Sequence, residues 1–238
     1  MTTDHVAGAV PSTHTSPAGA TEPPSRAGVV RRRLLVVSMV LAALTLLVGH
    51  ALNVPATLPT GSFLDDVQAH PSAFLTGGLV QAAAAFLLIP SAVGIMALAP
   101  SRGASWATAG TVLTGLGAAA TGAGLVMITT MMAMLAGTDR GLAGRVYELA
   151  ASSSVTGLPF LLAPAMLVGL LLSGIALLRA RTVHAAIAIV LMVGAVLAGL
   201  APGGGPAGAL GHLPLAVALL LLAERLWRRT PAPRRSAV

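Results

Sequence analysis

Long uncharged apolar runs alternate with short polar connections along most of this chain. The longest run covers residues 106–137, and about 18 consecutive apolar residues are enough to suggest a transmembrane helix. Because the runs are continuous and do not alternate with polar residues, they exclude a transmembrane β-barrel. The pattern predicts an all-α fold, a polytopic transmembrane helix bundle with six spans, at residues 34–52, 73–99, 106–137, 158–178, 183–200 and 207–223.

The predicted bundle lies between two polar tails. Residues 1–30 are rich in Pro, Ser, Thr, Gly and Ala, a composition that cannot bury enough apolar area to fold, so we expect a disordered cytoplasmic tail. Residues 31–226 form the six-helix transmembrane domain, and residues 227–238 form a basic cytoplasmic tail. Three arginines at 31–33 precede the first run, which is long enough to be a retained helix rather than a cleaved export signal.

The third predicted span carries small residues along one helical face. They recur at alternating spacings of four and three, at Gly110, Thr114, Gly117, Thr121 and Gly124. In lipid there is little hydrophobic drive between helices, so a face of small residues marks where another backbone can approach closely. We therefore expect this helix to be the packing hub of the bundle.

Two longer polar connections, residues 53–71 and 138–156, join the spans on one side of the predicted membrane. Within the second, residues 142–151 have the pattern of a short amphipathic helix on the membrane surface. The second, fourth and sixth spans each contain a proline, Pro90, Pro164 and Pro214. This recurrence suggests three helical hairpins with a shared plan, although apolar low complexity also produces such matches.

Composition agrees with a membrane protein. Charged residues make up 9% of the chain, against about a quarter in a typical soluble domain. The absence of cysteine excludes disulfides, thiolate metal sites and cysteine nucleophiles.

The net charge of +7 comes from arginines that flank the apolar runs, which makes them topology signals and disfavours nucleic acid as a partner. All arginines except Arg140 and Arg145 fall on the side of the two tails. By the positive-inside rule, we expect both termini to be cytoplasmic. The partners we expect are the lipid bilayer and a membrane protein, either another chain or a second copy of this one.

No Asp, Glu, Lys or Arg lies inside any predicted span. Intramembrane charges are costly and are retained mainly for function, so their absence argues against carboxylate-coupled transport and against an intramembrane protease. We therefore expect no enzymatic activity and no cofactor.

Histidine is the remaining candidate for chemistry. His50, His70 and His212 all fall near the predicted external face and are candidate ligand-binding residues. Such imidazoles could hold a metal, and two on facing helices could ligate a haem. Alternatively, each ring bonds a local backbone carbonyl and caps its own helix end.

A polar cavity is a second candidate. Proline inside a helix frees a backbone carbonyl, and carbonyls freed by Pro90 and Pro164 could line such a cavity together with Gln81 and the threonines of the third span. Structural accommodation of the prolines by neighbouring helices is the alternative.

The membrane region resembles small uncharacterised multi-pass inner-membrane proteins of GC-rich bacteria. The resemblance rests on the motif His70-Pro71-Ser72-Ala73-Phe74 at the start of the second span and on the hairpin after Pro90. It implies a membrane location and no assigned activity. The leading hypothesis is a non-enzymatic accessory or interaction component. The alternatives are a small-molecule permease or permease subunit, and a haem- or metal-binding redox protein.

Overall fold

The computed structural model describes residues 25–53, 60–152, 158–201 and 203–229, and within these ranges it contains helices and no strand. The predicted all-α class is confirmed. The helices are α1 (Arg26–Leu52), α2 (Thr60–Ala69), α3 (Pro71–Leu98), the 3-10 turn η1 (Ser101–Gly103), α4 (Ala104–Ala136), α5 (Arg140–Ser152), α6 (Leu158–Ala180), α7 (Ala185–Leu200) and α8 (Gly205–Arg228).

Five of the described helices are long and apolar enough to cross a membrane: α1, α3, α4, α6 and α8. The remaining predicted span, residues 183–200, forms α7, whose 16 residues are fewer than the about 20 that a span usually needs. The structure thus agrees with a membrane helix bundle and gives five candidate spans.

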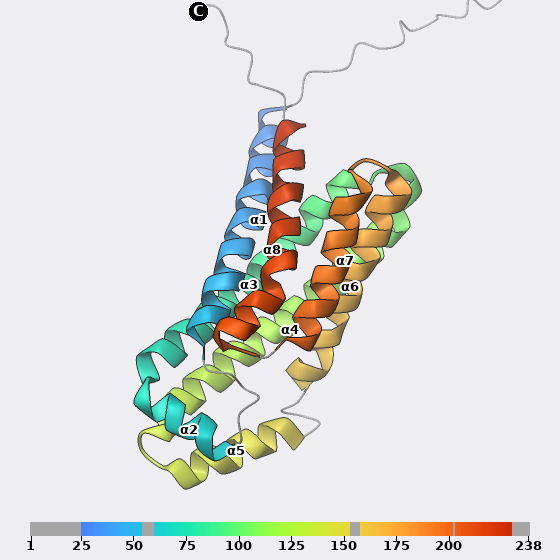
Figure 1. The fold of residues 1–238 in the computed structure, drawn as a ribbon. Helices are drawn as coiled ribbons and strands as arrows, with labels where there is room; N and C mark the ends of the chain where they lie inside the picture. The colour runs from blue at the N-terminus through green and yellow to red at the C-terminus, as the bar shows by residue number, and fades with distance from the viewer. Residues whose placement is uncertain (1–24, 54–59, 153–157, 202, 230–238) are drawn as a thin grey trace, which may run out of the picture.

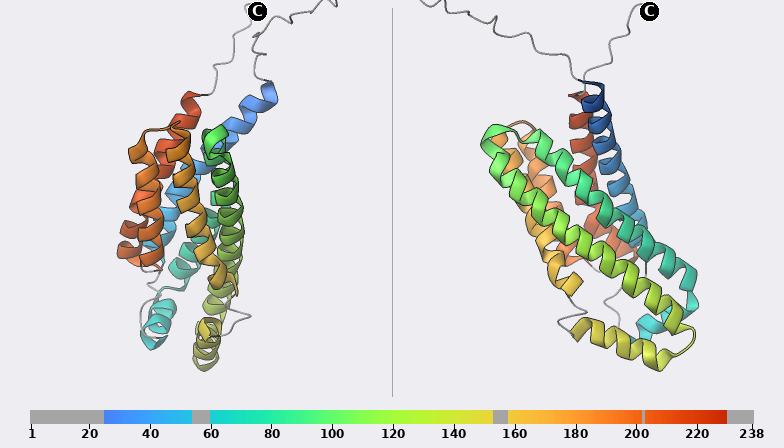
Figure 2. Two further views of the ribbon diagram at one scale, coloured as in Figure 1. Left: turned by 90° about the vertical axis from the view of Figure 1, so that its right-hand side faces the viewer. Right: turned by 180° about the vertical axis from the view of Figure 1, so that it is seen from behind.

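The long helices and α7 form a closed ring (Figure 1). Each packs on the next in chain order, and α8 returns to pack against α1. Both ends of the α1–α8 pair are tied, since Arg32 donates to the Arg229 carbonyl at 2.5 Å and the Gly205 amide donates to the Asn53 carbonyl at 2.7 Å. As Figure 2 shows, α3 and α4 cross α1 and α8 obliquely, so they extend beyond the rest of the ring at one end.

The first helix begins earlier than its apolar run. Ser25 caps α1 by accepting a hydrogen bond from the Gly28 amide at 3.2 Å, so Arg31, Arg32 and Arg33 lie inside the helix. At the other end of the chain, α8 continues through Arg225 to Arg228. Charged residues mark where a helix leaves an apolar environment, and a helix does not have to end there.

The small-residue face of α4 lies where the sequence predicts. A Cβ on Gly117 would lie 2.7 Å from Met166 Cβ and 2.8 Å from the Leu162 carbonyl oxygen of α6. Gly110 is equally constrained, because its Cβ would lie 2.7 Å from the Gly169 carbonyl oxygen. On the opposite face Leu116 is 58% exposed. Close approach of α4 and α6 therefore depends on the absence of side chains at these glycines.

The two polar connections contain helices that cover the protruding ends of α3 and α4. Helix α2 was not predicted, and α5 corresponds to the amphipathic helix predicted at residues 142–151. Their apolar faces form a second hydrophobic core with α3 and α4, made of Phe63, Leu64, Val67, Phe74, Met132, Ala136 and Ala143. Ala143 of α5 is fully buried in it, whereas Leu142 and Leu149 of the same helix are exposed, so part of the apolar surface of α5 packs on protein and part does not.

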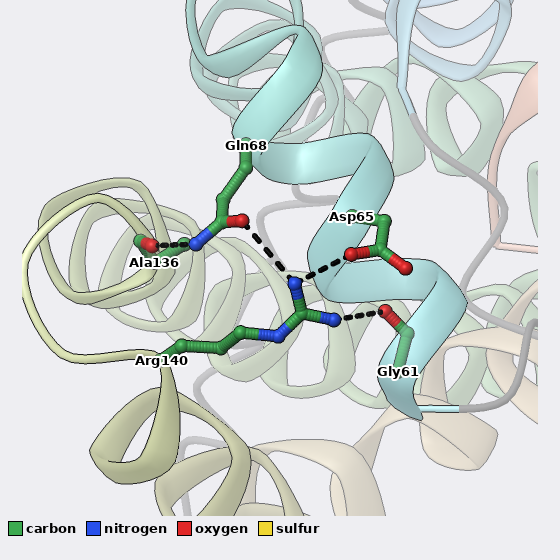
Figure 3. Close-up of polar contacts among 5 residues, drawn as sticks. All are labelled: Gly61, Asp65, Gln68, Ala136 and Arg140. Carbon is green, nitrogen blue, oxygen red and sulfur yellow. Dashed lines mark hydrogen bonds and ion pairs between the residues drawn. The ribbon is translucent and has the colours of Figure 1, made fainter.

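Arg140 joins α5 to α2 at the edge of this second core (Figure 3). Its guanidinium lies 2.5 Å from a carboxylate oxygen of Asp65 and donates to the Gly61 carbonyl at 3.2 Å. The side-chain amide of Gln68 donates in turn to the Ala136 carbonyl of α4. Because both Arg140 and Asp65 are largely exposed, this ion pair orients the two helices and adds little stability.

Candidate functional site

A cavity of about 460 Å³ lies inside the helix ring, with walls from all the helices that form it. Its size falls within the about 300–1,000 Å³ of typical small-molecule sites. The lining side chains and backbone belong to Leu46, His50, Gln81, Ala85, Leu88, Thr121, Leu125, Ala163, Pro164, Met166, Leu167, Ala198, Gly199, Ala201, Gly203, His212 and Leu215. Most of this wall is apolar, and the polar groups on it are few.

Two histidines from opposite ends of the sequence meet at this wall. The rings of His50 in α1 and His212 in α8 stack with their centroids 3.7 Å apart and their planes 27° apart. His212 is 8% exposed, and His50 is partly buried. The contact exists because α8 closes the ring against α1.

The hydrogen bonds of the two rings determine which nitrogen carries the proton. Nδ1 of His50 lies 2.7 Å from the Leu46 carbonyl oxygen, and Nδ1 of His212 lies 2.8 Å from the Gly208 carbonyl oxygen. A carbonyl can only accept, so each Nδ1 carries the hydrogen. In the neutral imidazole, Nε2 is then an unprotonated acceptor. The pair therefore places two rings, each with one acceptor nitrogen, in the wall of the cavity.

A chain of amide hydrogen bonds fixes the wall beside the histidines. The Asn53 side-chain amide donates to Gln81 Oε1 at 2.8 Å, and Gln81 Nε2 donates to the Gly203 carbonyl at 2.9 Å. Gly49 lets Gln81 come this close to α1, because a Cβ there would lie 2.9 Å from Gln81 Cγ. The end of α1, the middle of α3 and the start of α8 are thus held together at one place.

Thr121 lines the wall from α4. Its Oγ1 is buried and has no hydrogen-bond partner within the described part of the chain. Buried hydroxyls are normally satisfied, so this hydroxyl is an exception. Thr114 Oγ1 has the same property, but it packs against Gly169 in the α4–α6 contact and does not line the cavity.

The structure separates the three predicted histidines. His50 and His212 come together, whereas His70 is exposed at the start of α3 and does not line the cavity. The alternative prediction for the two paired rings, a bond from each to a local carbonyl, is also confirmed. Of the residues predicted to line a polar cavity, Gln81 and Pro164 do so and Pro90 does not.

The stacked arrangement of the two rings differs from the arrangement that ligation of a haem by two histidines needs. Two axial imidazoles of a haem point their nitrogens at each other across the porphyrin plane, whereas these rings stack face to face. Within the described ranges, no three His, Asp or Glu residues lie close enough together to hold a metal ion.

The sequence left two features of the site unrecognised. Asn53 follows the first apolar run and resembles an ordinary connection residue. Gly203 belongs to a glycine-rich break, and only the fold shows that its carbonyl accepts a hydrogen bond from Gln81.

The helices that form the site agree with an integral membrane protein by length and composition. Comparison of the chain with protein-family models, with curated proteins and with solved structures finds no match.

Proposed function

We propose that this chain is a non-enzymatic integral protein of the bacterial inner membrane that binds a small uncharged molecule inside its helix ring. Among the hypotheses from sequence, this corresponds to the small-molecule permease or permease subunit. The observation that carries it is the cavity of about 460 Å³, walled by all the ring helices and carrying the His50–His212 pair.

The chemistry of the wall points to the class of molecule. Among the described residues that line the cavity none is Asp, Glu, Lys or Arg, so an ionic ligand would find no permanently charged side chain to pair with there. Each of the two neutral imidazoles in the wall offers one acceptor, its Nε2 atom. A neutral, largely apolar molecule with at least one hydroxyl or N–H donor matches this wall.

The ring arrangement supports six spans, with α7 as the sixth. Helix α7 packs between α6 and α8, and both of those helices are long enough to span. Helix α7 begins just after the arginine-bearing turn that follows α6. A helix of 16 residues is about 24 Å long, somewhat short of the about 30 Å hydrocarbon core, a mismatch that local thinning of the bilayer can accommodate. The arginine asymmetry supports cytoplasmic termini.

A matched pair of probes tests the binding function. We expect 1-naphthol to raise the thermal unfolding midpoint of the purified full-length chain, and 1-methoxynaphthalene, which lacks the hydroxyl, to raise it much less. A ligand bound only to the folded state stabilises it by mass action, so the shift reports binding. The His50→Leu/His212→Leu double variant should lose the difference between the two probes.

The control is His184→Ala, because His184 caps α7 away from the cavity, where Nδ1 accepts from the Ala186 amide at 3.3 Å. This variant should keep the wild-type response. Equal midpoint shifts for both probes, or a response that survives removal of both cavity histidines, would refute recognition of a donor by the pair.

A further inference from the structure

Three arginines surround a hollow of about 490 Å³ where two turns meet at one end of the ring. It is lined by Arg102 of η1 and by Leu178, Arg179 and Arg181 around the end of α6. All three arginines are exposed. Figure 1 shows the α3–α4 and α6–α7 turns side by side, at the end of the ring opposite α2 and α5.

Tertiary contacts hold the two turns in this position. Gly103 lies against the Ala176 carbonyl, and its Cβ, if present, would lie 3.3 Å from Ala180 Cβ. The Thr182 hydroxyl donates to the Leu98 carbonyl, and Arg229 donates to the Thr182 carbonyl at 2.7 Å. The arginines therefore project from a fixed backbone.

The backbone of Arg181 is unusual. Its φ is 53°, in the left-handed region that glycine normally occupies at the end of a helix, and its amide donates to the Leu177 carbonyl at 3.0 Å. An arginine in this conformation strains the backbone where glycine would not. This backbone strain is explained if the guanidinium at this position serves a function.

Within the residues that the structure describes, no acidic side chain pairs with these arginines. The described ion pairs join Arg140 to Asp65 and Arg228 to Glu224, and neither involves the hollow. Arg179 instead lies over the ring of Trp106, with Cζ 5.8 Å from the ring centroid. Tryptophan is favoured at the membrane–water interface, so this stack places the hollow at headgroup depth if the helices span a bilayer.

We infer that the hollow formed by Arg102, Arg179 and Arg181 binds the phosphate of an anionic phospholipid. The guanidinium is a planar donor fork that matches phosphate oxygens, and convergent arginines can share one phosphodiester. Leu178 and Trp106 offer apolar contacts to the glycerol and upper acyl chains. Basic pockets between transmembrane helices on the cytoplasmic side are suited to such headgroups. The inference requires a membrane location but is independent of the ligand in the central cavity.

The two tryptophans of the chain provide the test. In a Trp227→Phe background, Trp106 is the single fluorophore and lies beside the hollow. The full-length protein is reconstituted in vesicles of phosphatidylcholine and phosphatidylglycerol, with one lipid or the other brominated near the headgroup end of its acyl chains. Bromine quenches tryptophan on contact, so the two quenching curves give the lipid composition next to Trp106.

We expect phosphatidylglycerol to be enriched at Trp106 above its bulk fraction. The Arg102→Gln/Arg181→Gln variant should reduce that preference by about thirtyfold, the loss expected for two arginine contacts at a membrane surface. It leaves the Arg179–Trp106 stack in place, so the fluorophore keeps its surroundings.

The matched control is Arg26→Gln/Arg225→Gln, which removes the same charge from exposed positions that do not line the hollow. It should keep the preference at about 0.15 M salt, where diffuse attraction is screened beyond about 8 Å. Equal quenching by the two lipids, or equal loss in the control, would overturn the inference. Abolition of the preference by millimolar inorganic phosphate would also overturn it, because the site would then hold free phosphate and not a lipid.

Discussion

At the scale of single residues, the contact between His50 and His212 changes the meaning of each histidine. Each ring bonds a carbonyl of its own helix, His50 near the end of α1 and His212 inside α8. The 3.7 Å stack joins these two local arrangements across the α1–α8 contact. The two side chains therefore form one unit in the wall of the cavity.

We predict that His50→Ala and His212→Ala are not additive in their effect on the free energy of unfolding in detergent. Residues in contact usually couple by about 0.5–3 kcal/mol, and a stacked ring pair should fall near 1 kcal/mol. A double-mutant cycle measures this coupling. The control cycle pairs His50→Ala with His184→Ala, which lies in a different part of the ring, and should be additive. Additivity in both cycles would mean that the stack contributes nothing beyond the two local hydrogen bonds.

At the scale of elements, α4 and α6 pack closely because small residues line the contact between them. Gly110 and Gly117 from α4 face Gly169 and the Met166 backbone of α6, so neither helix can accept a larger residue there. The other end of α4 has a different role. The 33 residues of α4 form a helix about 50 Å long, which exceeds the hydrocarbon core of a bilayer. Helices α2 and α5 cover the last turns of α4.

We predict that Gly117→Leu lowers stability by about 1–3 kcal/mol or more, because the added side chain overlaps the α6 backbone and forces the helices apart. Leu116→Ile, one residue away on the exposed face, should change stability by less than about 0.5 kcal/mol. Thermal unfolding in detergent compares the two variants. Similar midpoints for both would show that the glycine face is not the α4–α6 contact.

At the scale of the whole molecule, the closed ring creates two features that no single helix contains. The central cavity needs α8 to return to α1, and the arginine hollow needs the α3–α4 turn to meet the α6–α7 turn. These features lie toward opposite ends of the ring. The arginine asymmetry, with the hollow on the side of the termini, predicts how the ring is oriented in the membrane.

Orientation can be measured by thiol labelling, since the chain has no cysteine of its own. A cysteine at the exposed Ser62 of α2 should react with an impermeant reagent in intact cells, because α2 is expected outside. One at Ser236, in the C-terminal tail, should react only after the cells are opened. Reversal of this pattern would overturn the proposed orientation.

The sequence alone determined the class of fold, most of the helix positions and the small face of α4, because hydrophobic length and residue size act locally along a helix. It also singled out His50, His212, Gln81 and Pro164, since polar groups and prolines in apolar runs are rare enough to notice. It missed α2, whose ten residues have no long apolar run and are stabilised by packing on α3 and α4. Only tertiary structure decided that His50 meets His212 while His70 does not, and that Arg102 joins Arg179 and Arg181. The physical reason is that pairing between distant segments depends on how the ring closes, and closure depends on side-chain packing between helices rather than on the pattern within any one of them.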